Sequence, residues 1–298
     1  MINRQSISKK QNTVIDGKPY IWGVKTYVMG IVNVTNDSFS GDGIGYNPEA
    51  ATDQALKFQD EGADFIDVGA ESTRPPSIYA NVKRVTVEEE IKRVVPVIEL
   101  MSRKLNIPIS IDTYKSDVAR CAFESGAALI NDIWGLQFDR RMTDVVLKYE
   151  CPVIVMHNQE NTFYEDLIKD ISLKLKRTID LAIKSGIKKE NIILDPGIGF
   201  GKTAEQNINV IKNLEAFIDL GQPLLIGTSR KSFIGHVLDV PIENRLEGTA
   251  ATVALAINSG VDIVRVHDVK EIVKVSKMAD AIIRWSWRDE FLIKYIYH

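Results

Sequence analysis

Short β-branched runs alternate with longer amphipathic stretches along most of the chain, and this alternation restricts the fold more than any other feature. Four of the longer stretches carry apolar residues at helical spacing, and these are Pro48–Glu61, Val87–Lys104, Leu167–Ser185 and Ala204–Leu220. Eight runs resemble buried strands, and these are Tyr27–Val34, Phe65–Val68, Ile107–Ile111, Leu129–Asn131, Val153–Met156, Ile192–Leu194, Leu224–Ile226 and Ile263–Val266. Alternating strands and helices indicate parallel βα units, and eight units predict an α/β fold, a single (β/α)₈ TIM barrel.

The length of 298 residues suits one such barrel, which typically takes roughly 250 residues. We therefore expect one domain over 1–298, with the barrel core at about 25–284. Glycines follow three of the predicted helices, at Gly62, Gly126 and Gly260, as expected just past a helix end. The turn residues of Asp16–Lys25 predict a short N-terminal hairpin that closes the bottom of the barrel.

Composition narrows the class of partner. A net charge of −3 gives no general field for nucleic acid or an anionic membrane, so we expect small-molecule partners. No run approaches the ~20 apolar residues of a membrane span and no signal-peptide pattern occurs, which predicts a cytoplasmic protein. Cys121 and Cys151 lack CxxC spacing, and we expect buried, inert thiols.

Polar and glycine-rich segments follow the predicted strands one after another. In a barrel these strand ends meet at one face, where active sites lie. The segments therefore predict one binding site, and they are Gly30–Ser40, Asp67–Pro75, Ile111–Thr113, Ile130–Ile133, Met156–Asn158, Asp195–Thr203, Gly227–Phe233 and Arg265–Val269.

Other readings of these motifs fail on spacing. A phosphate-binding loop that ends at Lys202–Thr203 needs glycine at position 196, which is Pro196, so we exclude a nucleoside triphosphate site. His157 and His267 belong to no His-x-x-x-His pattern, which argues against zinc. Carboxylates accompanied by an amide and a lysine suit the donor–acceptor edge of a heterocycle better than a sugar.

In these segments the chain resembles the dihydropteroate synthases, from about Met29 to Val269. The resemblance implies that Asp112, Asn131, Asp195 and Lys231 line a pterin pocket. An ionised Asp195 can accept two N–H bonds from the guanidine-like edge of a pterin. The residues alone leave three alternatives open: Asp195 as a helix cap, Asn131 as a buried brace for a loop, and Lys231 as a solvated loop lysine.

The resemblance also implies a pyrophosphate site. Arg265 and His267 would contact the pyrophosphate, and Asn33 would help to hold Mg²⁺. Together with Lys231 and Asp112, Arg265 and His267 would form the catalytic set. A structural ion pair of Arg265 with Asp268 or a glutamate is the alternative, as is a strand-end role for the Asn33 amide.

The second substrate, 4-aminobenzoate, would contact Phe200 and Ser232, with Phe39 covering it. Thr73 and Arg74 would lie over the pyrophosphate and the incoming amine. The chain departs from the family pattern at Asn36, where proline is usual, and at Pro76, where glycine is common. These changes affect loop stiffness and remove no charged or ligating group.

The implied reaction condenses 6-hydroxymethyl-7,8-dihydropterin pyrophosphate with 4-aminobenzoate and releases pyrophosphate. Two alternatives are a methyltetrahydrofolate–corrinoid methyltransferase and a catalytically silent pterin-binding homologue. The resemblance further implies a homodimer formed through C-terminal helices. The small-residue segment Gly248–Ile257 suits such an interface, and it suits core packing equally well.

Overall fold

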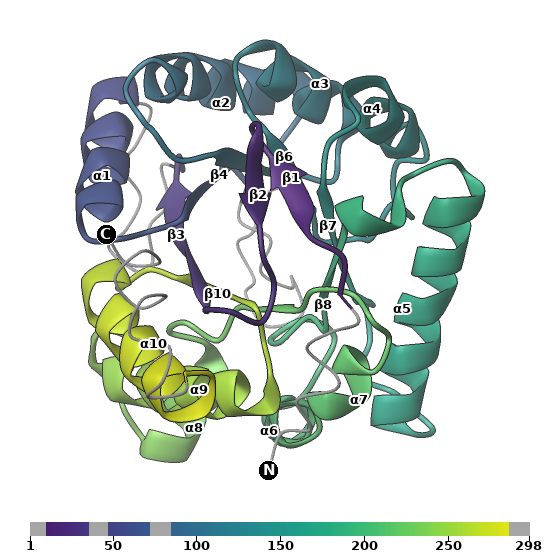
Figure 1. Cartoon of the computed structure of the whole chain (residues 1–298), viewed down its shortest axis with the longest axis vertical. Helices are drawn as coiled ribbons and strands as arrows, with labels where there is room; N and C mark the ends of the chain where they lie inside the picture. The colour runs from purple at the N-terminus through teal and green to yellow at the C-terminus, as the bar shows by residue number, and fades with distance from the viewer. Residues whose placement is uncertain (1–9, 36–46, 72–84, 286–298) are drawn as a thin grey trace.

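The computed structural model describes residues 10–35, 47–71 and 85–285, which form a barrel of parallel strands surrounded by helices (Figure 1). The barrel strands are β3 (Tyr27–Asn33), β4 (Phe65–Gly69), β5 (Ile109–Asp112), β6 (Leu129–Asp132), β7 (Val153–Met156), β8 (Ile192–Asp195), β9 (Leu225–Ile226) and β10 (Ile263–Val266). They lie in the order β8-β7-β6-β5-β4-β3-β10-β9, and a bridge between Leu194 and Leu224 closes the ring. The predicted (β/α)₈ barrel is confirmed.

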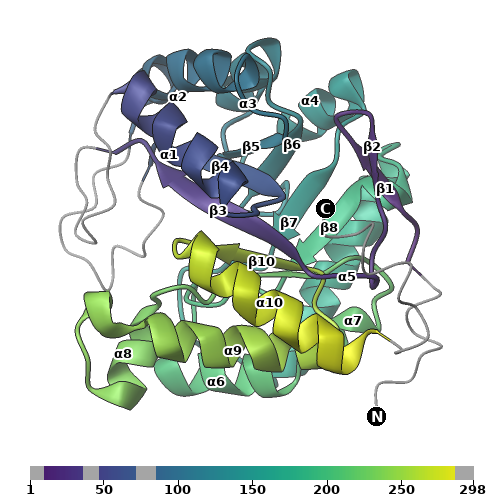
Figure 2. The same cartoon turned by 60° about the vertical axis from the view of Figure 1, so that its left-hand side comes forward.

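Helices cover the outside of the barrel, and Figures 1 and 2 both show α9 and α10 side by side. The helices are α1 (Pro48–Asp60), α2 (Val87–Ser102), α3 (Ser116–Glu124), α4 (Met142–Tyr149), α5 (Leu167–Lys184), α6 (Ala204–Lys212), α7 (Glu215–Ile218), α8 (Ser232–Leu238), α9 (Leu246–Ser259) and α10 (Val269–Ile283). Gly62, Gly126 and Gly260 all have positive φ, as their places after helix ends predict.

Two predicted boundaries are wrong, each for a local reason. The single helix expected over Ala204–Leu220 is divided into α6 and α7. Asn213 ends α6, where its side-chain amide donates to Asn209 O at 2.8 Å and its backbone leaves the helical region. Strand β5 begins at Ile109 instead of Ile107, since Pro108 has no N–H to donate to a neighbouring strand.

The N-terminal hairpin pairs β1 (Thr13–Ile15) with β2 (Lys18–Tyr20), so it exists but begins before Asp16. It lies across one opening of the barrel (Figure 1). There the ring of Tyr20 stacks on Phe65 with 4.7 Å between centroids. Hairpin and inner strand residues together form the lower core, which consists of Ile15, Tyr20, Trp22, Tyr27, Met29, Phe65, Leu129, Ile154, Ile193, Leu225 and Ile263. This apolar floor fills the bottom of the barrel.

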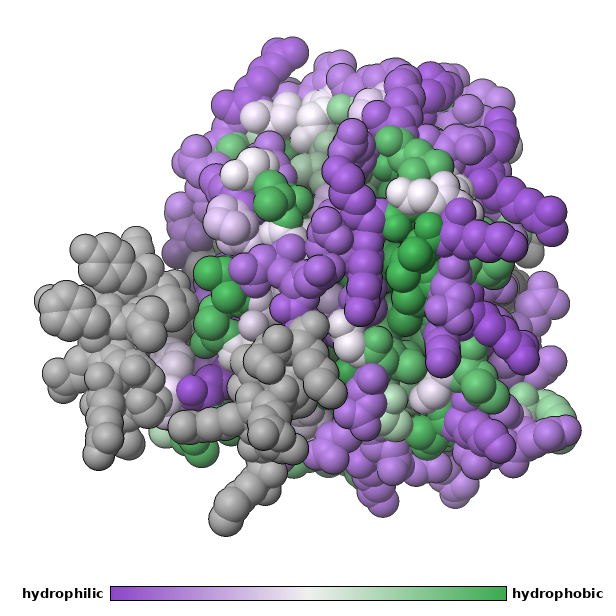
Figure 3. Space-filling model, turned by 45° about the vertical axis from the view of Figure 1, so that its right-hand side comes forward, coloured by the Kyte–Doolittle hydropathy of each residue, from purple (hydrophilic) through white to green (hydrophobic). Residues whose placement is uncertain are grey.

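The outer face visible in Figure 3 is mainly hydrophilic, with hydrophobic patches between charged side chains. In the described part of the chain, no helix combines the length and apolarity that crossing a membrane requires. Both cysteines are free thiols. Cys151 is buried, which raises its pKa to about 12, but Cys121 is partly exposed on α3, so the expected burial is wrong for Cys121.

Candidate active site

The inner wall of the barrel changes from apolar to polar directly above the lower core. Residues two apart on a strand face the same side, so a polar residue two positions after a core residue also points inward. Four strands have this arrangement, in the pairs Phe65 and Asp67, Leu129 and Asn131, Ile193 and Asp195, and Ile263 and Arg265. The strands therefore place a polar layer on an apolar floor.

Arg265 is held inside this layer by two aspartates. Its Nε donates to Asp67 Oδ2 at 2.5 Å, and its Nη2 donates to Asp112 Oδ2 at 2.7 Å. Asn131 Nδ2 donates to the same Asp67 oxygen at 3.0 Å. These four residues, from β10, β4, β5 and β6, are called the Arg265 cluster below. The cluster brings together three of the predicted site residues, Asp112, Asn131 and Arg265.

The Arg265 cluster has unused acceptors. Asp67 Oδ1 and Asp112 Oδ1 are buried and lack a hydrogen-bond partner among the described residues. Burial raises the pKa of Asp112 to about 7, although the Arg265 guanidinium acts in the opposite direction. Leaving a buried acceptor unpaired costs about 1–3 kcal/mol. The cluster is thus suited to receive N–H donors from a ligand.

Asp195, at the end of β8, is a second buried carboxylate near this layer. Its Oδ1 accepts the N–H of Gly197 at 2.7 Å, and its pKa is raised by burial, against the effects of that bond and of Lys231. Gly197 has φ +72°, and a Cβ there would lie 2.0 Å from His157 O, so only glycine fits. Helix α6 is capped by Thr203, which excludes Asp195 as its cap.

Lys231 and Phe200 meet at the edge of the site. The Lys231 Nζ lies 4.4 Å from the centroid of the Phe200 ring, a cation–π contact. Phe200 also packs against the aromatic and apolar group of Tyr114, Ile133 and Met156. Lys231 is therefore a partly buried residue with an aromatic partner, not a solvated loop lysine. Ser232 follows it as the exposed first residue of α8.

His267 follows β10 and contacts Ser229. Its Nδ1 lies 2.9 Å from Ser229 Oγ, which also accepts the backbone N–H of His267 at 3.1 Å. A hydroxyl that donates to Nδ1 leaves the ring proton of neutral His267 on Nε2. The alternative pairing of Arg265 with Asp268 is wrong, because Asp268 pairs with Arg230, with 2.5 Å between Arg230 Nη2 and Asp268 Oδ1.

Asn33 ends β3 beside Gly69 of β4, and its side chain is half-buried. It makes no hydrogen bond to another described side chain. The expectations for Phe39, Thr73 and Arg74, and the departures at Asn36 and Pro76, lie outside the described residues.

The sequence analysis assigned no contact to two residues of this region, Asp67 and Ser229. Asp67 was included both in the predicted strand Phe65–Val68 and in the polar segment Asp67–Pro75, and its place two positions after a core phenylalanine was a usable signal for an inward-facing carboxylate. Ser229 lies inside a quoted motif, but its contact with His267 joins residues 38 positions apart, which no local pattern reveals.

Comparisons with known proteins agree with this geometry. Residues 29–267 match the family model described as pterin binding enzyme. The chain is 50% identical to a dihydropteroate synthase of Clostridium beijerinckii over 91% of this chain and 99% of that protein. A structure of the Clostridium difficile dihydropteroate synthase, in the presence of pteroic acid, covers 89% of this chain and 100% of its own, with TM-score 0.84 and 50% identity. The Xanthomonas albilineans enzyme in complex with 7,8-dihydropteroate gives TM-score 0.82 and 35% identity, over 93% and 100% of the two chains.

Charge coupling inside the Arg265 cluster predicts the effect of Asp67→Asn. The change removes the Asp67 carboxylate, which raises the pKa of Asp112. It also leaves Asp112 as the one carboxylate partner of Arg265 within the cluster, so the pKa of Asp112 should fall. In the wild type, a pKa above the ordinary carboxyl value means that Asp112 lowers stability as pH rises from about 4 to about 7. Asp67→Asn should reduce this loss.

The measurement is a pH titration of the Asp112 carboxyl carbon by NMR, with chemical denaturation at several pH values. Asp64→Asn is the matched control, because Asp64 pairs with Lys25 at 2.6 Å outside the cluster. An Asp112 titration curve that is the same in Asp67→Asn as in the wild type would contradict the coupling.

Proposed function

The chain belongs to the pterin-binding enzyme family, and we propose that it acts there as a dihydropteroate synthase through the polar layer above the lower core. The reaction condenses 6-hydroxymethyl-7,8-dihydropterin pyrophosphate with 4-aminobenzoate to give 7,8-dihydropteroate and pyrophosphate. The observation that carries the proposal is the set of buried carboxylates with unpartnered oxygens beside Arg265.

The pterin ring binds to residues at the strand ends and to Lys231, which precedes α8. Its guanidine-like edge presents adjacent N–H groups, and the Asp195 carboxylate accepts them in the way a carboxylate accepts a guanidinium. Asn131 offers a donor and an acceptor, and Lys231 donates to ring oxygen or nitrogen. The unpartnered Asp112 oxygen receives another ring N–H. Because these groups are buried, an unmatched ring would leave several of them unpaired, which gives specificity for the pterin.

The pyrophosphate is bound at the ends of β9 and β10. Arg265 has five N–H groups and uses two of them on the aspartates, so others remain for phosphate oxygens or for stacking over the ring. His267, oriented by Ser229, supplies a second donor. Phosphate sites are common in this part of a barrel.

Mg²⁺ fits this arrangement through Asn33. Among the described residues no group of three or more His, Cys, Asp or Glu side chains could hold a metal. Asn33 at the end of β3 would hold the ion through its neutral amide oxygen, a donor that Mg²⁺ accepts together with phosphate oxygens and water. When bound, the ion neutralises charge on the pyrophosphate.

The chemical step exchanges one bond at the exocyclic carbon. The amine nitrogen of 4-aminobenzoate forms a bond to this carbon, and the carbon–oxygen bond breaks with its electron pair moving to pyrophosphate. The amine then loses one proton. Arg265 and His267 stabilise the charge that develops on the leaving oxygen, and Asp112 stabilises the positive pterin. Phe200 and Ser232 contact the incoming 4-aminobenzoate.

A coupled assay for pyrophosphate release tests the function. Release that requires both substrates is the expected result. Binding of the pterin pyrophosphate without release would indicate a silent homologue, and methyl transfer from methyltetrahydrofolate to a corrinoid would indicate the methyltransferase.

Asp195→Ala should abolish binding of the pterin, because it leaves ring N–H donors without acceptors in a buried pocket, at a cost of about 1–3 kcal/mol each. Calorimetry measures this binding. Thr203→Ala, which removes the true cap of α6, is the control that should bind the pterin normally.

Metal dependence gives a separate prediction. EDTA should stop turnover but leave binding of the bare pterin unchanged, because the ion would be held by Asn33 and the pyrophosphate, which the bare pterin lacks. Asn33→Ala should raise the Mg²⁺ concentration needed for half-maximal rate. Full activity after thorough chelation, or loss of pterin binding with the metal, would exclude this arrangement.

The proposal includes a homodimer in the cytoplasm. Exposed apolar side chains on α8, α9 and α10, among them Val237, Leu255 and Met278, offer an interface between C-terminal helices. Gly248 packs instead against α8, where a Cβ would lie 2.3 Å from Ile234. Light scattering should give twice the chain mass of 33.4 kDa, and Leu255→Lys should reduce the mass to that of one chain. A wild type of single-chain mass at micromolar concentration would exclude the dimer.

A further inference from the structure

Lys202 is a buried lysine that the reaction leaves without a role. The residue is only 4% exposed, and its Nζ donates to Gly197 O at 2.9 Å and to Phe200 O at 3.0 Å. The third neighbour is His157 Nδ1, at 3.1 Å. The three hydrogens of an ammonium group therefore have three acceptors, two of which are carbonyl groups of the same loop, 196–203, between β8 and α6.

The glycine-rich backbone of this loop can adopt many conformations, so side-chain hydrogen bonds are needed to hold it in one of them. Gly197, Gly199 and Gly201 all have positive φ, and glycine reaches many other conformations at little cost. Between them lies Phe200, whose ring contacts Lys231. Lys202 holds the carbonyl of Phe200 and that of the first glycine, so it ties the two sides of the glycine-rich turn together.

Three charged groups and the neutral ring of His157 act on Lys202, and they come from β7, β8, α5 and the segment after β9. Asp195 on β8 favours its ammonium form, whereas Lys174 on α5 and Lys231 after β9 disfavour it. Burial is the largest influence, and it lowers the pKa of Lys202 to about 7. His157 at the end of β7 has a pKa lowered to about 2 by burial and by Lys202, so it stays neutral and its Nδ1 acts as the acceptor.

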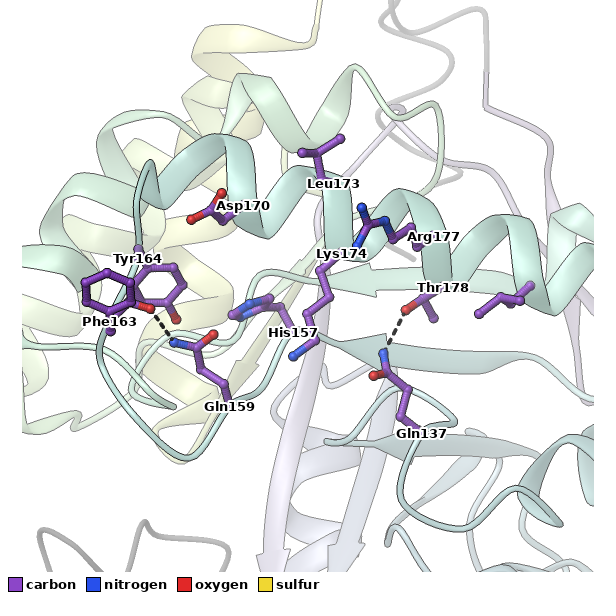
Figure 4. A pocket seen from close by; sticks show the side chains of 11 residues that line it. Gln137, His157, Gln159, Phe163, Tyr164, Asp170, Leu173, Lys174, Arg177 and Thr178 are labelled. Carbon is purple, nitrogen blue, oxygen red and sulfur yellow. Dashed lines mark hydrogen bonds between the residues drawn. The ribbon is translucent and has the colours of Figure 1, made fainter.

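His157, the neighbour of Lys202, also lines a cavity of about 520 Å³ between the loop after β7 and α5 (Figure 4). Figure 4 shows Lys174 in this cavity beside His157. The Nζ of Lys174 donates to Asn158 O at 2.6 Å and makes no hydrogen bond to the described loop 196–203. The two lysines thus offer a matched pair, of which only Lys202 donates hydrogen bonds to the loop.

We propose that Lys202 is a positioning residue that fixes the loop 196–203 and thereby the Phe200 ring that receives 4-aminobenzoate. The inference rests on the proposed function, because it assigns Phe200 to the second substrate. The pterin pocket is built on strand ends whose places are set by the barrel ladder, whereas Phe200 belongs to a loop. Loss of Lys202 should therefore weaken the binding of 4-aminobenzoate more than the binding of the pterin pyrophosphate.

Steady-state kinetics and calorimetry on the full chain test this split. Lys202→Met should raise the KM for 4-aminobenzoate at least tenfold, while the Kd for the pterin pyrophosphate stays within threefold of wild type. Lys174→Met, which removes a nearby positive charge, should change neither value by more than twofold. Lys202→Gln retains an amide donor and should raise the KM less than Lys202→Met. It also serves as the working variant if Lys202→Met does not fold.

Hydrogen exchange measures the loop independently of turnover. In Lys202→Met or Lys202→Gln the amides of Gly199 and Phe200 should exchange faster, with α6 unchanged and with no such effect in Lys174→Met. An inactive wild type would refute the proposed function, and the exchange data would still decide whether Lys202 fixes the loop. An unchanged KM for 4-aminobenzoate, an equal loss of pterin affinity, or unaltered exchange would overturn the inference.

Discussion

The upper interior of the barrel depends on one interaction, the guanidinium of Arg265 between the carboxylates of Asp67 and Asp112. Arg265 lies 198 positions from Asp67 and 153 positions from Asp112 in the sequence, so the interaction connects β10 to β4 and β5. Burying charges is costly, and well-packed apolar residues often give equal or greater stability than a buried ion pair. Removing one partner alone costs about 3–5 kcal/mol, because it leaves a buried charge unpaired. With two carboxylates and one guanidinium, the arrangement is incomplete by itself, and this points to a ligand more than to stability.

The hydrogen bonds between the barrel strands fix where the residues of the Arg265 cluster lie relative to one another. Gly69, Asp112 and Asn131 are register partners on β4, β5 and β6, so their levels are fixed by backbone hydrogen bonds. The lower core fixes which side of each strand faces inward, since a one-residue slip would turn Phe65 outward and Ile66 inward. The hairpin that covers the lower core contributes to the site in the same indirect way, through the ring of Tyr20 on Phe65. Packing at the bottom of the barrel therefore determines the direction of the polar side chains above it.

Periodicity predicted the barrel, its eight strands and the gathering of polar segments at one face, because these depend on local pattern and on a fold with few alternatives. The individual roles expected for Asp112, Asn131 and Arg265 came from the family resemblance. Details that depend on partners far apart in the sequence could not be predicted. Arg265 was given Asp268 as its alternative partner on nearness in the chain, but Asp268 pairs with Arg230. The break at Asn213 arises from one side-chain bond within an otherwise helical pattern. Lys202 was considered only as a failed phosphate-loop lysine, and nothing local indicated that its amine contacts carbonyl groups and His157.

The residues that we propose for the two substrates belong to parts of the structure that are held in different ways. Asp112, Asn131, Asp195 and Arg265 all lie on strands, and displacing any of them would break ladder hydrogen bonds. Phe200 and Ser232 lie beyond the strands, and Phe200 is held in a glycine-rich turn by side chains from elsewhere, among them Lys202 and the hydroxyl of Tyr164 on Gly201 O. A turn with three glycines has little conformational preference of its own. The position of Phe200 is therefore set by these few hydrogen bonds, so we expect substitutions around the turn to alter the proposed 4-aminobenzoate site while the proposed pterin pocket keeps its shape.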